Sequence, residues 1–299
     1  MIEIKNITKS FDGRKVLENL SSTIKKGSIY GLIGSNGAGK STLLNVIDGV
    51  YLPDSGECKI MGENVYENIK IKEKVAYISD EPYFFNSFTM EEEAKYLNNV
   101  HPSFTMRKFS EISRLFPLDI KKKISTFSKG MKRQAAIVME LSKNPDVLLC
   151  DESFDGLDPV IRQLVKKIII DEVADRQMTA MVSSHNLREI ENFCDVIGIL
   201  HDNTIVCEQT LDELKENFVK IQVAFKENPG DAFYNDFNII SKDVRSSITE
   251  LVIKGNKQDI IKKFEALNPV LIDILDLTLE DIFIYEMEAK GYDFSKLLS

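Results

Sequence analysis

Apolar residues in the first 215 positions form short runs that alternate with helical patterns. The runs Ile29–Ile33 and Val147–Cys150 are too apolar to be half exposed, which is typical of parallel strands covered on both faces. Between about residues 80 and 141 the pattern turns mainly helical. We therefore expect residues 1–215 to form an α/β domain, a mainly parallel sheet wrapped by helices, with a helical subdomain at about residues 80–141.

The pattern changes after Lys215. The segments KIQVAFK, SSITELVIKG and VLIDILDL predict strands, and NKQDIIKKFEAL and TLEDIFIYEMEAKG predict helices. The last of these helices begins with a capping box from Thr278 to Asp281. Residues 216–299 are therefore expected to form a small α+β domain, and no catalytic group of residues stands out within them.

Composition narrows the class of protein. The 299 residues are 43% hydrophobic, which is enough for a sizeable core. The formal net charge of -9 opposes capture of phosphate backbones, so we expect no nucleic-acid partner. The four cysteines, Cys58, Cys150, Cys194 and Cys207, form no CxxC pair and are expected to be core residues in a reducing compartment.

The opening segment and the apolar runs bear on location. The chain starts with the strand-like MIEIKNITKS, without the cationic start and apolar stretch of a secretory signal. Its apolar runs are far shorter than the roughly 20 residues that a membrane helix needs. We expect a cytoplasmic protein, for which another chain would supply any membrane-spanning part.

A glycine-rich segment of the form GxxxxGK[ST] lies between the run Ile29–Ile33 and a helical pattern that begins near Lys40. Its glycines let successive backbone N–H groups point at one anion, and the helix N-terminus adds further donors. An ordinary turn is the alternative, but the flanking strand and helix favour a phosphate-binding loop. Lys40 would bridge the β- and γ-phosphates and Ser41 would ligate Mg²⁺. The expected nucleotide-binding residues of this loop are Gly34, Ser35, Asn36, Gly37, Ala38, Gly39, Lys40, Ser41 and Thr42.

Two further strands end in polar residues. Asp151 and Glu152 follow the run Val147–Cys150, and we expect Asp151 to hold Mg²⁺ and Glu152 to polarise the attacking water. His185 ends the strand-like segment MTAMVSSH, where an imidazole can contact the γ-phosphate and orient Glu152 or the water. Solvated acids and a structural histidine are the alternatives; we assign that structural role to His101 and His201.

The order of these motifs resembles that of the ATP-binding subunits of ABC transporters. The resemblance covers about residues 1–215 and rests on GSNGAGKST, YLPDSGECKIMG, YISDEPYFF, FSKGMKRQ, VLLCDE, FDGLD and SSH, in that order. It implies a P-loop cassette with a mainly parallel sheet, an antiparallel β edge and a helical subdomain, which uses ATP and Mg²⁺ as an ATPase.

The resemblance also assigns a role to Phe127–Gln134 (FSKGMKRQ), called the signature segment below. In the family, its serine and glycine contact the γ-phosphate bound by the other subunit of a dimer, which implies this role for Ser128 and Gly130. A hydroxyl and backbone donors at a helix N-terminus suit such a contact. Phe127, Lys129 and Met131 depart from the usual LSGGQ pattern.

Three more residues acquire expected roles in the same way. Asp80 stands where the family has a glutamine near Mg²⁺; a carboxylate can coordinate the metal but cannot donate a hydrogen bond when ionised, and Glu81 is a weaker substitute. Phe11 matches the aromatic that stacks on adenine, with core packing as the alternative. Asp158 matches a loop that touches the partner subunit.

The expected function is that of an ATP-binding and hydrolysing subunit that energises a separate permease. The ending TLEDIFIYEME is similar to subunits of bacterial exporters of the bacitracin-resistance type. We expect a homodimer on the cytoplasmic face of the membrane, with Tyr83, Phe84, Phe85 and Phe88 either in the permease contact or in the core. A soluble ABC ATPase acting without a permease and an ATP-sensing module that does not turn over are the alternatives.

Overall fold

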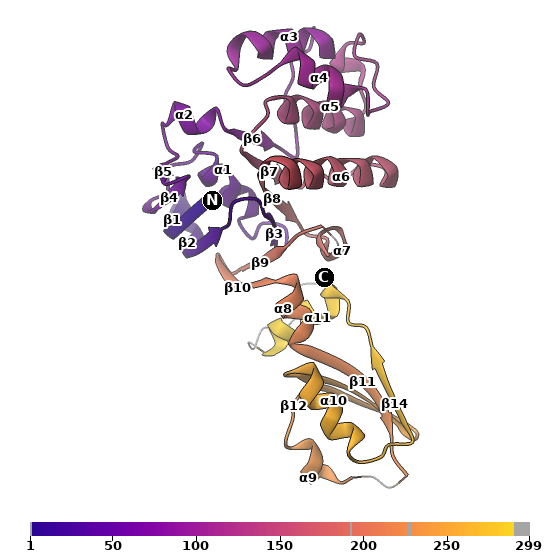
Figure 1. Ribbon diagram of the computed structural model, residues 1–299. Coiled ribbons are helices and arrows are strands. Elements are labelled where there is room, and N and C mark those ends of the chain that lie inside the picture. Colours follow the sequence, from indigo (N-terminus) through magenta and orange to yellow (C-terminus); the bar gives the residue numbers. More distant parts are fainter. Residues whose placement is uncertain (1, 192, 227–228, 290–299) are drawn as a thin grey trace. The chain divides into compact units, whose positions relative to one another are not determined.

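The computed structural model describes residues 2–191, 193–226 and 229–289. It divides into two compact units, Met1–Glu208 and Gln209–Ser299, which we call the cassette and the second unit (Figure 1). The boundary expected after Lys215 lies inside helix α8 (Leu211–Glu216), whereas the compact units divide before that helix. The domain limits expected from the sequence stay a prediction.

The centre of the cassette is a six-stranded sheet with the order β10-β9-β3-β8-β7-β6. Its strands are β3 (Ile29–Ile33), β6 (Val75–Ile78), β7 (Val147–Asp151), β8 (Thr179–Ser184), β9 (Val196–His201) and β10 (Thr204–Thr210). Strands β6, β7, β8, β3 and β9 pair in parallel, and every residue of β3, β7 and β8 is buried. The carboxyl ends of β3, β7 and β8 therefore meet at one edge of the sheet.

A second, antiparallel sheet with the order β2-β1-β4-β5 completes the cassette's β structure. It consists of β1 (Ile2–Phe11), β2 (Arg14–Ile24), β4 (Ser55–Ile60) and β5 (Glu63–Asn64). Apolar residues of both sheets and of helix α1 (Lys40–Ile47) pack into one core cluster, which includes Ile4, Leu32, Leu44 and Leu149. The expected α/β class with an antiparallel β edge is confirmed.

The part of the cassette between β6 and β7 is helical, as the sequence pattern predicted (Figure 1). It contains α3 (Met90–Val100), α4 (Met106–Ser113), a 3-10 turn (Ile124–Thr126) and α5 (Lys129–Ser142). Thr89 and Glu92 form a capping box at the start of α3. Ser128 caps α5, because its Oγ accepts a hydrogen bond from Met131 N at 3.2 Å.

The remaining helices of the cassette are α2 (Ile69–Lys72), α6 (Pro159–Arg176) and α7 (Leu187–Ile190). Asp158 caps α6 by accepting hydrogen bonds from Val160 N and Ile161 N, with Pro159 in the first turn. Cys58, Cys150, Cys194 and Cys207 are buried thiols that form no disulfide within the described residues, as expected. In the described ranges, none of the helices combines the length and apolar character required to span a bilayer.

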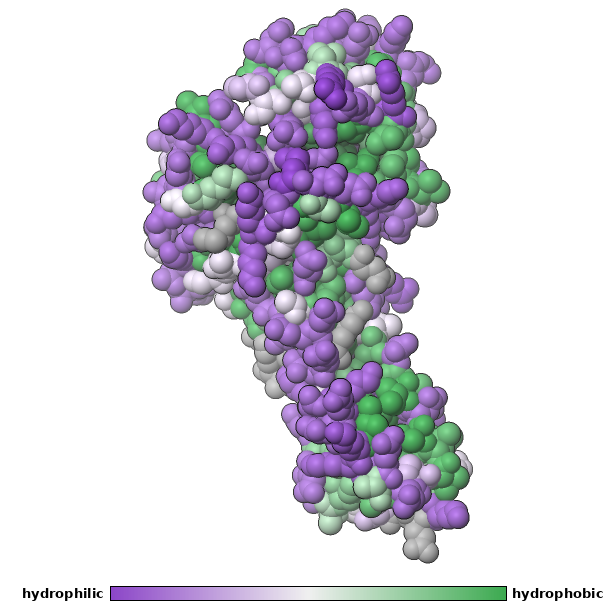
Figure 2. All heavy atoms as spheres, viewed as in Figure 1, coloured by the Kyte–Doolittle hydropathy of each residue, from purple (hydrophilic) through white to green (hydrophobic). Residues whose placement is uncertain are grey.

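The second unit contains an antiparallel sheet with the order β12-β13-β11-β14. Its elements are α8, β11 (Phe218–Ala224), α9 (Asp231–Tyr234), β12 (Asn238–Arg245), β13 (Ile248–Lys254), α10 (Lys257–Glu265), β14 (Leu271–Leu275) and α11 (Leu279–Ala289). Strand β12 was not predicted from the sequence. Most of its residues are exposed, so the sequence lacks the alternation of apolar and polar residues that marks a half-buried strand. Figure 2 shows apolar residues along the side of this unit where β14 lies, in agreement with the exposure of Leu271 and Ile274.

Candidate site for nucleotide binding and hydrolysis

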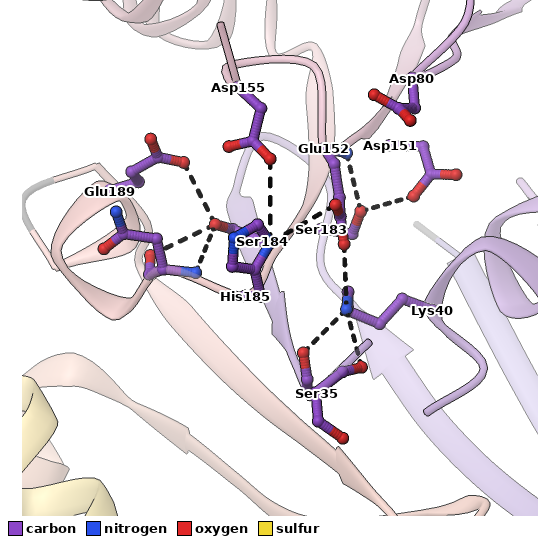
Figure 3. Close-up of polar contacts among 12 residues, drawn as sticks. Ser35, Lys40, Asp80, Asp151, Glu152, Asp155, Ser183, Ser184, His185 and Glu189 are labelled. Carbon is purple, nitrogen blue, oxygen red and sulfur yellow. Dashed lines mark hydrogen bonds and ion pairs between the residues drawn. The ribbon is translucent and has the colours of Figure 1, made fainter. Parts of the chain in front are cut away.

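Side chains from three loops of the cassette converge where β3, β7 and β8 end (Figure 3). Lys40, which begins α1 after the β3 loop, lies with its Nζ 3.1 Å from Oε1 of Glu152. The other oxygen of Glu152, Oε2, lies 3.4 Å from Nδ1 of His185, the residue after β8. The structure therefore brings together Lys40, Glu152 and His185, the three expected catalytic residues.

The loop from Gly34 to Thr42, the phosphate loop, presents backbone donors to an anion. Gly39 is the N-cap of α1 with φ 106, and no side chain caps this helix. Gly37 has φ 81, and a β-carbon placed there would meet nothing within 4 Å, so space lies open beside the loop. Because the first N–H groups of a helix have no partner within it, these amides fit the phosphates of a nucleotide.

Lys40 is already held in place by the phosphate loop. Its side chain is 3% exposed, and Nζ donates hydrogen bonds to the backbone oxygens of Gly34 at 2.8 Å and Ser35 at 3.1 Å. These carbonyl groups aim the ammonium group at the space where Glu152 also points (Figure 3). A buried lysine with these partners is suited to receive phosphate oxygens.

Asp151 lies deeper in the sheet edge and is buried. Its Oδ1 accepts a hydrogen bond from Ser183 Oγ at 2.7 Å, and its Oδ2 accepts one from the Tyr77 hydroxyl at 3.1 Å. Burial, and then the charge of Asp151, raises the pKa of Tyr77, so this hydroxyl stays a donor at neutral pH. A fixed carboxylate with the exposed Ser41 hydroxyl on α1 supplies oxygen donors of the kind that Mg²⁺ prefers.

Glu152 owes its direction to a turn of the backbone. Its φ of 45 lies in the left-handed region, which is uncommon for a residue with a side chain. The backbone N–H of Glu152 donates to Ser183 Oγ at 3.0 Å, so the same serine holds both Asp151 and Glu152. This turn separates the two acids, with Asp151 buried and Glu152 beside Lys40 and His185.

His185 belongs to a loop that is held in place by hydrogen bonds among neighbouring polar groups, two of which, Ser184 and Glu189, are buried. Ser184 Oγ accepts a hydrogen bond from Asn186 N at 2.9 Å and donates to Glu189 Oε2 at 3.2 Å. Oε1 of Glu189 forms an ion pair with Arg162 of α6 at 3.0 Å. The imidazole itself is 43% exposed, with Asp155 Oδ2 3.8 Å from Nδ1, so it remains open to a bound nucleotide.

Other expected site residues lie apart from this cluster. Phe11 is 39% exposed and packs edge-on against Tyr51, which leaves part of its ring open. Ser128 and Asp158 are exposed and cap α5 and α6. In the described part of the chain, no hydrogen bond or ion pair joins Ser128 to Lys40.

Asp80 has a partner that the sequence did not predict. Its Oδ1 forms an ion pair with a guanidinium nitrogen of Arg133 on α5, whereas the expectation gave this carboxylate to Mg²⁺. Its role as a metal ligand stays a prediction. Tyr77, Ser183 and Asp155 were not expected in the site; Ser183 lies near the end of β8, two residues before His185, and that position was the available signal.

Comparisons with known proteins agree with this geometry. The family model described as ABC transporter matches residues 17–155. The chain is 32% identical to the ABC transporter ATP-binding protein YtrB of Bacillus subtilis, over 97% of this chain and 99% of that protein. It is 30% identical to the bacitracin transport ATP-binding protein BcrA of Bacillus licheniformis, over 95% and 96% of the two chains.

Solved structures share the cassette fold. The structure of an ATP binding subunit of an ABC transporter aligns with a TM-score of 0.67 and 27% identity, over 72% of this chain and 92% of that one. A dimeric post-hydrolysis state of the ATP-binding cassette MJ0796, bound to ADP and Pi, aligns with a TM-score of 0.65 and 23% identity, over 71% and 99%.

Proposed function

The chain belongs to the ABC transporter ATP-binding family, and we propose that it binds and hydrolyses ATP to energise a separate membrane permease. The observation that carries this proposal is the contact of Lys40 and His185 with the two oxygens of Glu152. A phosphate-binding cation, a carboxylate and an imidazole stand together at the ends of parallel strands. This arrangement fits hydrolysis of a γ-phosphate.

Nucleotide binding would rearrange the partners of Lys40. Phosphate oxygens would compete with Glu152 for Nζ, so the ammonium group would pass to the β- and γ-phosphates and leave Glu152 free to accept a proton from water. His185 would orient that water or contact the γ-phosphate from the opposite side. Phe11, with its partly open ring, would stack on the adenine.

The metal site would consist of Ser41 and Asp151, with Asp80 as a third oxygen donor. When bound, Mg²⁺ would offset the negative charge that develops during phosphoryl transfer. The chain holds the metal ligands in place: Ser183 and Tyr77 fix the Asp151 carboxylate by donating hydrogen bonds to it. The hydroxyl of Ser41 lies in the first turn of α1, one residue after Lys40.

Two copies would complete each other's site. Ser128 caps α5 and Gly130 lies in its first turn, which has no acidic residue, and no hydrogen bond or ion pair joins Ser128 to Lys40 within the described residues. A second ATP-binding subunit would receive them on the γ-phosphate bound at its Lys40, and Asp158 would contact that partner. We propose a homodimer, because one chain contains both halves.

The permease contact would lie in the helical subdomain. Tyr83 is 84% exposed, and Phe85 packs against both Phe88 and Tyr96 with ring centroids 4.9 and 5.3 Å apart. Two cavities of about 210 and 190 Å³ share Pro82, Tyr83 and Phe84 in their walls. These exposed aromatic residues beside cavities suit an apolar segment of a partner, here a cytoplasmic segment of the permease.

Export is the proposed direction of transport. Among the relatives are a bacitracin transport protein from Bacillus licheniformis and a lantibiotic transport protein from Streptococcus pyogenes, the latter 33% identical over 76% of this chain. The chain would work on the cytoplasmic face of the cell membrane, held there by the permease.

The test is ATP hydrolysis by the purified chain, with binding followed by a fluorescent ATP analogue. Lys40→Ala should abolish hydrolysis and weaken nucleotide binding by about 100-fold, because the buried cation that receives the phosphates is gone. Lys167→Ala, on the exposed surface of α6, is the matched lysine control and should behave like the unmutated chain. Equal hydrolysis by the Lys40→Ala chain would overturn the proposal.

A further inference from the structure

Glu93 is a buried carboxylate that the proposed chemistry does not use. It lies in the first turn of α3 and is only 7% exposed. A backbone hydrogen bond from Phe85 reaches its side chain, but its Oε2 accepts no hydrogen bond, and among the described residues no lysine or arginine forms an ion pair with it. Because burial of an unpaired charge is strongly unfavourable, this acid lowers the stability of the free chain.

Helix capping does not explain Glu93, because the two glutamates before it already serve the start of α3. Glu92 completes the capping box with Thr89, and Glu91 forms an ion pair with Lys95 at 2.9 Å. An acid in the first turn interacts favourably with the helix dipole, but an exposed acid does so without the cost of burial. The helix therefore does not require a buried carboxylate at this position.

The side chain of Glu93 lines the cavity of about 210 Å³ in the helical subdomain. Glu140 is a second acid in its wall, and the wall contains no lysine or arginine. Apolar side chains contribute much of the remaining surface, among them Phe84, Leu97 and Met139. The cavity therefore combines negative charge with an apolar lining.

A long basic side chain matches this cavity in both charge and shape. Lysine and arginine have an aliphatic stem that can lie along an apolar wall and a cationic head that can reach a carboxylate. Arginine fits better, because its guanidinium is more weakly hydrated than an ammonium group and can bind a carboxylate with two donors. Glu140 already pairs with Lys143 at 2.7 Å, so Glu93 is the acid with an oxygen left to accept a hydrogen bond.

We propose that Glu93 recognises an arginine side chain on the cytoplasmic segment of the permease. This inference rests on the proposed function and names the chemistry by which the chain selects that partner. Tyr83, which is 84% exposed, lines the same cavity, and Phe85 is 38% exposed. A free small cation would leave these rings in water, whereas a polypeptide segment covers them. The net charge of -9 favours a basic partner over a second copy of this acidic chain.

The first measurement compares the free chain with its complex with the permease encoded beside it, purified in detergent. Glu93→Gln keeps the shape of the side chain and removes its charge. In the free chain it should raise the melting temperature at pH 8 and by less at pH 4, because burial raises the pKa of Glu93 and the folded state then disfavours the ionised form. The affinity for the permease should fall by about 10- to 100-fold, the range for loss of a hydrogen bond to a charged group.

The opposite signs of these two effects separate recognition from a structural role. A carboxylate needed for folding would lower both the melting temperature and the affinity when replaced. The matched control is Glu91→Gln, two residues earlier on α3, which breaks only a partly exposed ion pair and should leave both quantities close to their parent values. Affinity for a fluorescent ATP analogue should be the same in all three chains.

The second measurement identifies the partner residue. A photo-crosslinking amino acid in place of Tyr83, followed by mass spectrometry, locates the permease segment that lies at the cavity. That segment should contain an arginine, and its replacement by glutamine should weaken the complex as much as Glu93→Gln does. The two substitutions together should weaken it no further, because both residues act through one contact.

The results distinguish this role of Glu93 from the proposed function. If the parent chain hydrolyses no ATP or forms no complex with the permease, the proposed function fails, and the role of Glu93 fails with it. If the complex forms, and either Glu93→Gln binds the permease as tightly as the parent or the crosslinked segment contains no arginine, the proposed function stands and the role of Glu93 is wrong.

Discussion

The six-stranded sheet of the cassette and the antiparallel sheet of the second unit use polar residues in opposite ways. In the cassette, parallel strands end at one edge, and the residues just beyond them, Glu152 and His185, meet Lys40 from the phosphate loop. In the second unit, polar residues within antiparallel strands satisfy each other: Glu250 of β13 accepts a hydrogen bond from Gln222 of β11 at 2.8 Å and forms an ion pair with Lys220 at 3.1 Å.

The difference lies in topology. A parallel sheet brings loops from distant parts of the sequence to the same edge, so charged groups can converge on one space and remain open to a ligand. An antiparallel pair sets each residue opposite a cross-strand neighbour, as Gln222 lies opposite Glu250, so its polar groups are matched in place. The convergence of charged side chains on one space, rather than the presence of carboxylates, distinguishes the cassette as the unit that contains the candidate catalytic site.

A glutamate-to-glutamine substitution in the cassette and one in the second unit should differ most in their effect on ATP hydrolysis. Glu152→Gln removes the proton acceptor beside Lys40 but keeps the shape of the side chain. We expect kcat for ATP hydrolysis to fall by about 100- to 10,000-fold with ATP binding retained, which is the range for loss of a general base. Steady-state phosphate release measures it, and a kcat within a few-fold of the unmutated value would contradict the role of Glu152.

The separateness of the two units can be tested through the core of the second. Phe264 is fully buried and packs against Phe233 and Phe237 with ring centroids 5.0 and 4.9 Å apart. Phe264→Ala should cost about 3–5 kcal/mol of stability. Hydrogen exchange should become faster in β11 and β13 and stay unchanged in β3 and β7. The control is Leu267→Ala, at an exposed position nearby; faster exchange in both sheets would show that the units unfold together.

A charge inside the cassette gives a prediction that depends on pH. Burial, with Glu140 nearby, raises the pKa of Asp48 at the end of α1 from 3.8 to about 6. The folded state therefore holds the proton more tightly than the unfolded state, and ionisation of Asp48 costs stability as pH rises from about 4 to 6. Asp48→Asn should stabilise the protein by roughly 1–2 kcal/mol at pH 7 and by little at pH 3.5, in chemical denaturation. A gain that does not vary with pH would contradict this explanation.

Glu250→Gln in the second unit is the counterpart of Glu152→Gln in the cassette, and we expect it to have the smallest effect on stability and on ATP hydrolysis. The hydrogen bond from Gln222, and then that from Lys220, lowers the pKa of Glu250, but the pair is partly exposed to solvent. We expect a loss of less than about 1 kcal/mol in denaturant unfolding and no change in ATP hydrolysis. A loss of hydrolysis comparable to that of Glu152→Gln would show that the second unit takes part in the chemistry.

The sequence predicted what depends on local pattern. The strand Ile29–Ile33, the helix from Lys40 and the capping box from Thr278 to Asp281 follow from periodicity and capping chemistry, and the structure confirms them. Contacts between distant segments could not be predicted in this way. Arg133 lies among other cations in the sequence and looks like a solvated residue, yet its partner Asp80 is 53 positions away.

The central claim is that each nucleotide site combines the phosphate loop of one copy with the signature segment of another. Its most direct test is ATP hydrolysis by an equimolar mixture of Lys40→Ala and Gly130→Asp chains. Each variant alone should be inactive, and the mixture should recover about a quarter of the unmutated rate, because half of the dimers would be mixed and each of these would hold one intact site. A mixture no more active than the two variants measured separately would contradict the shared site.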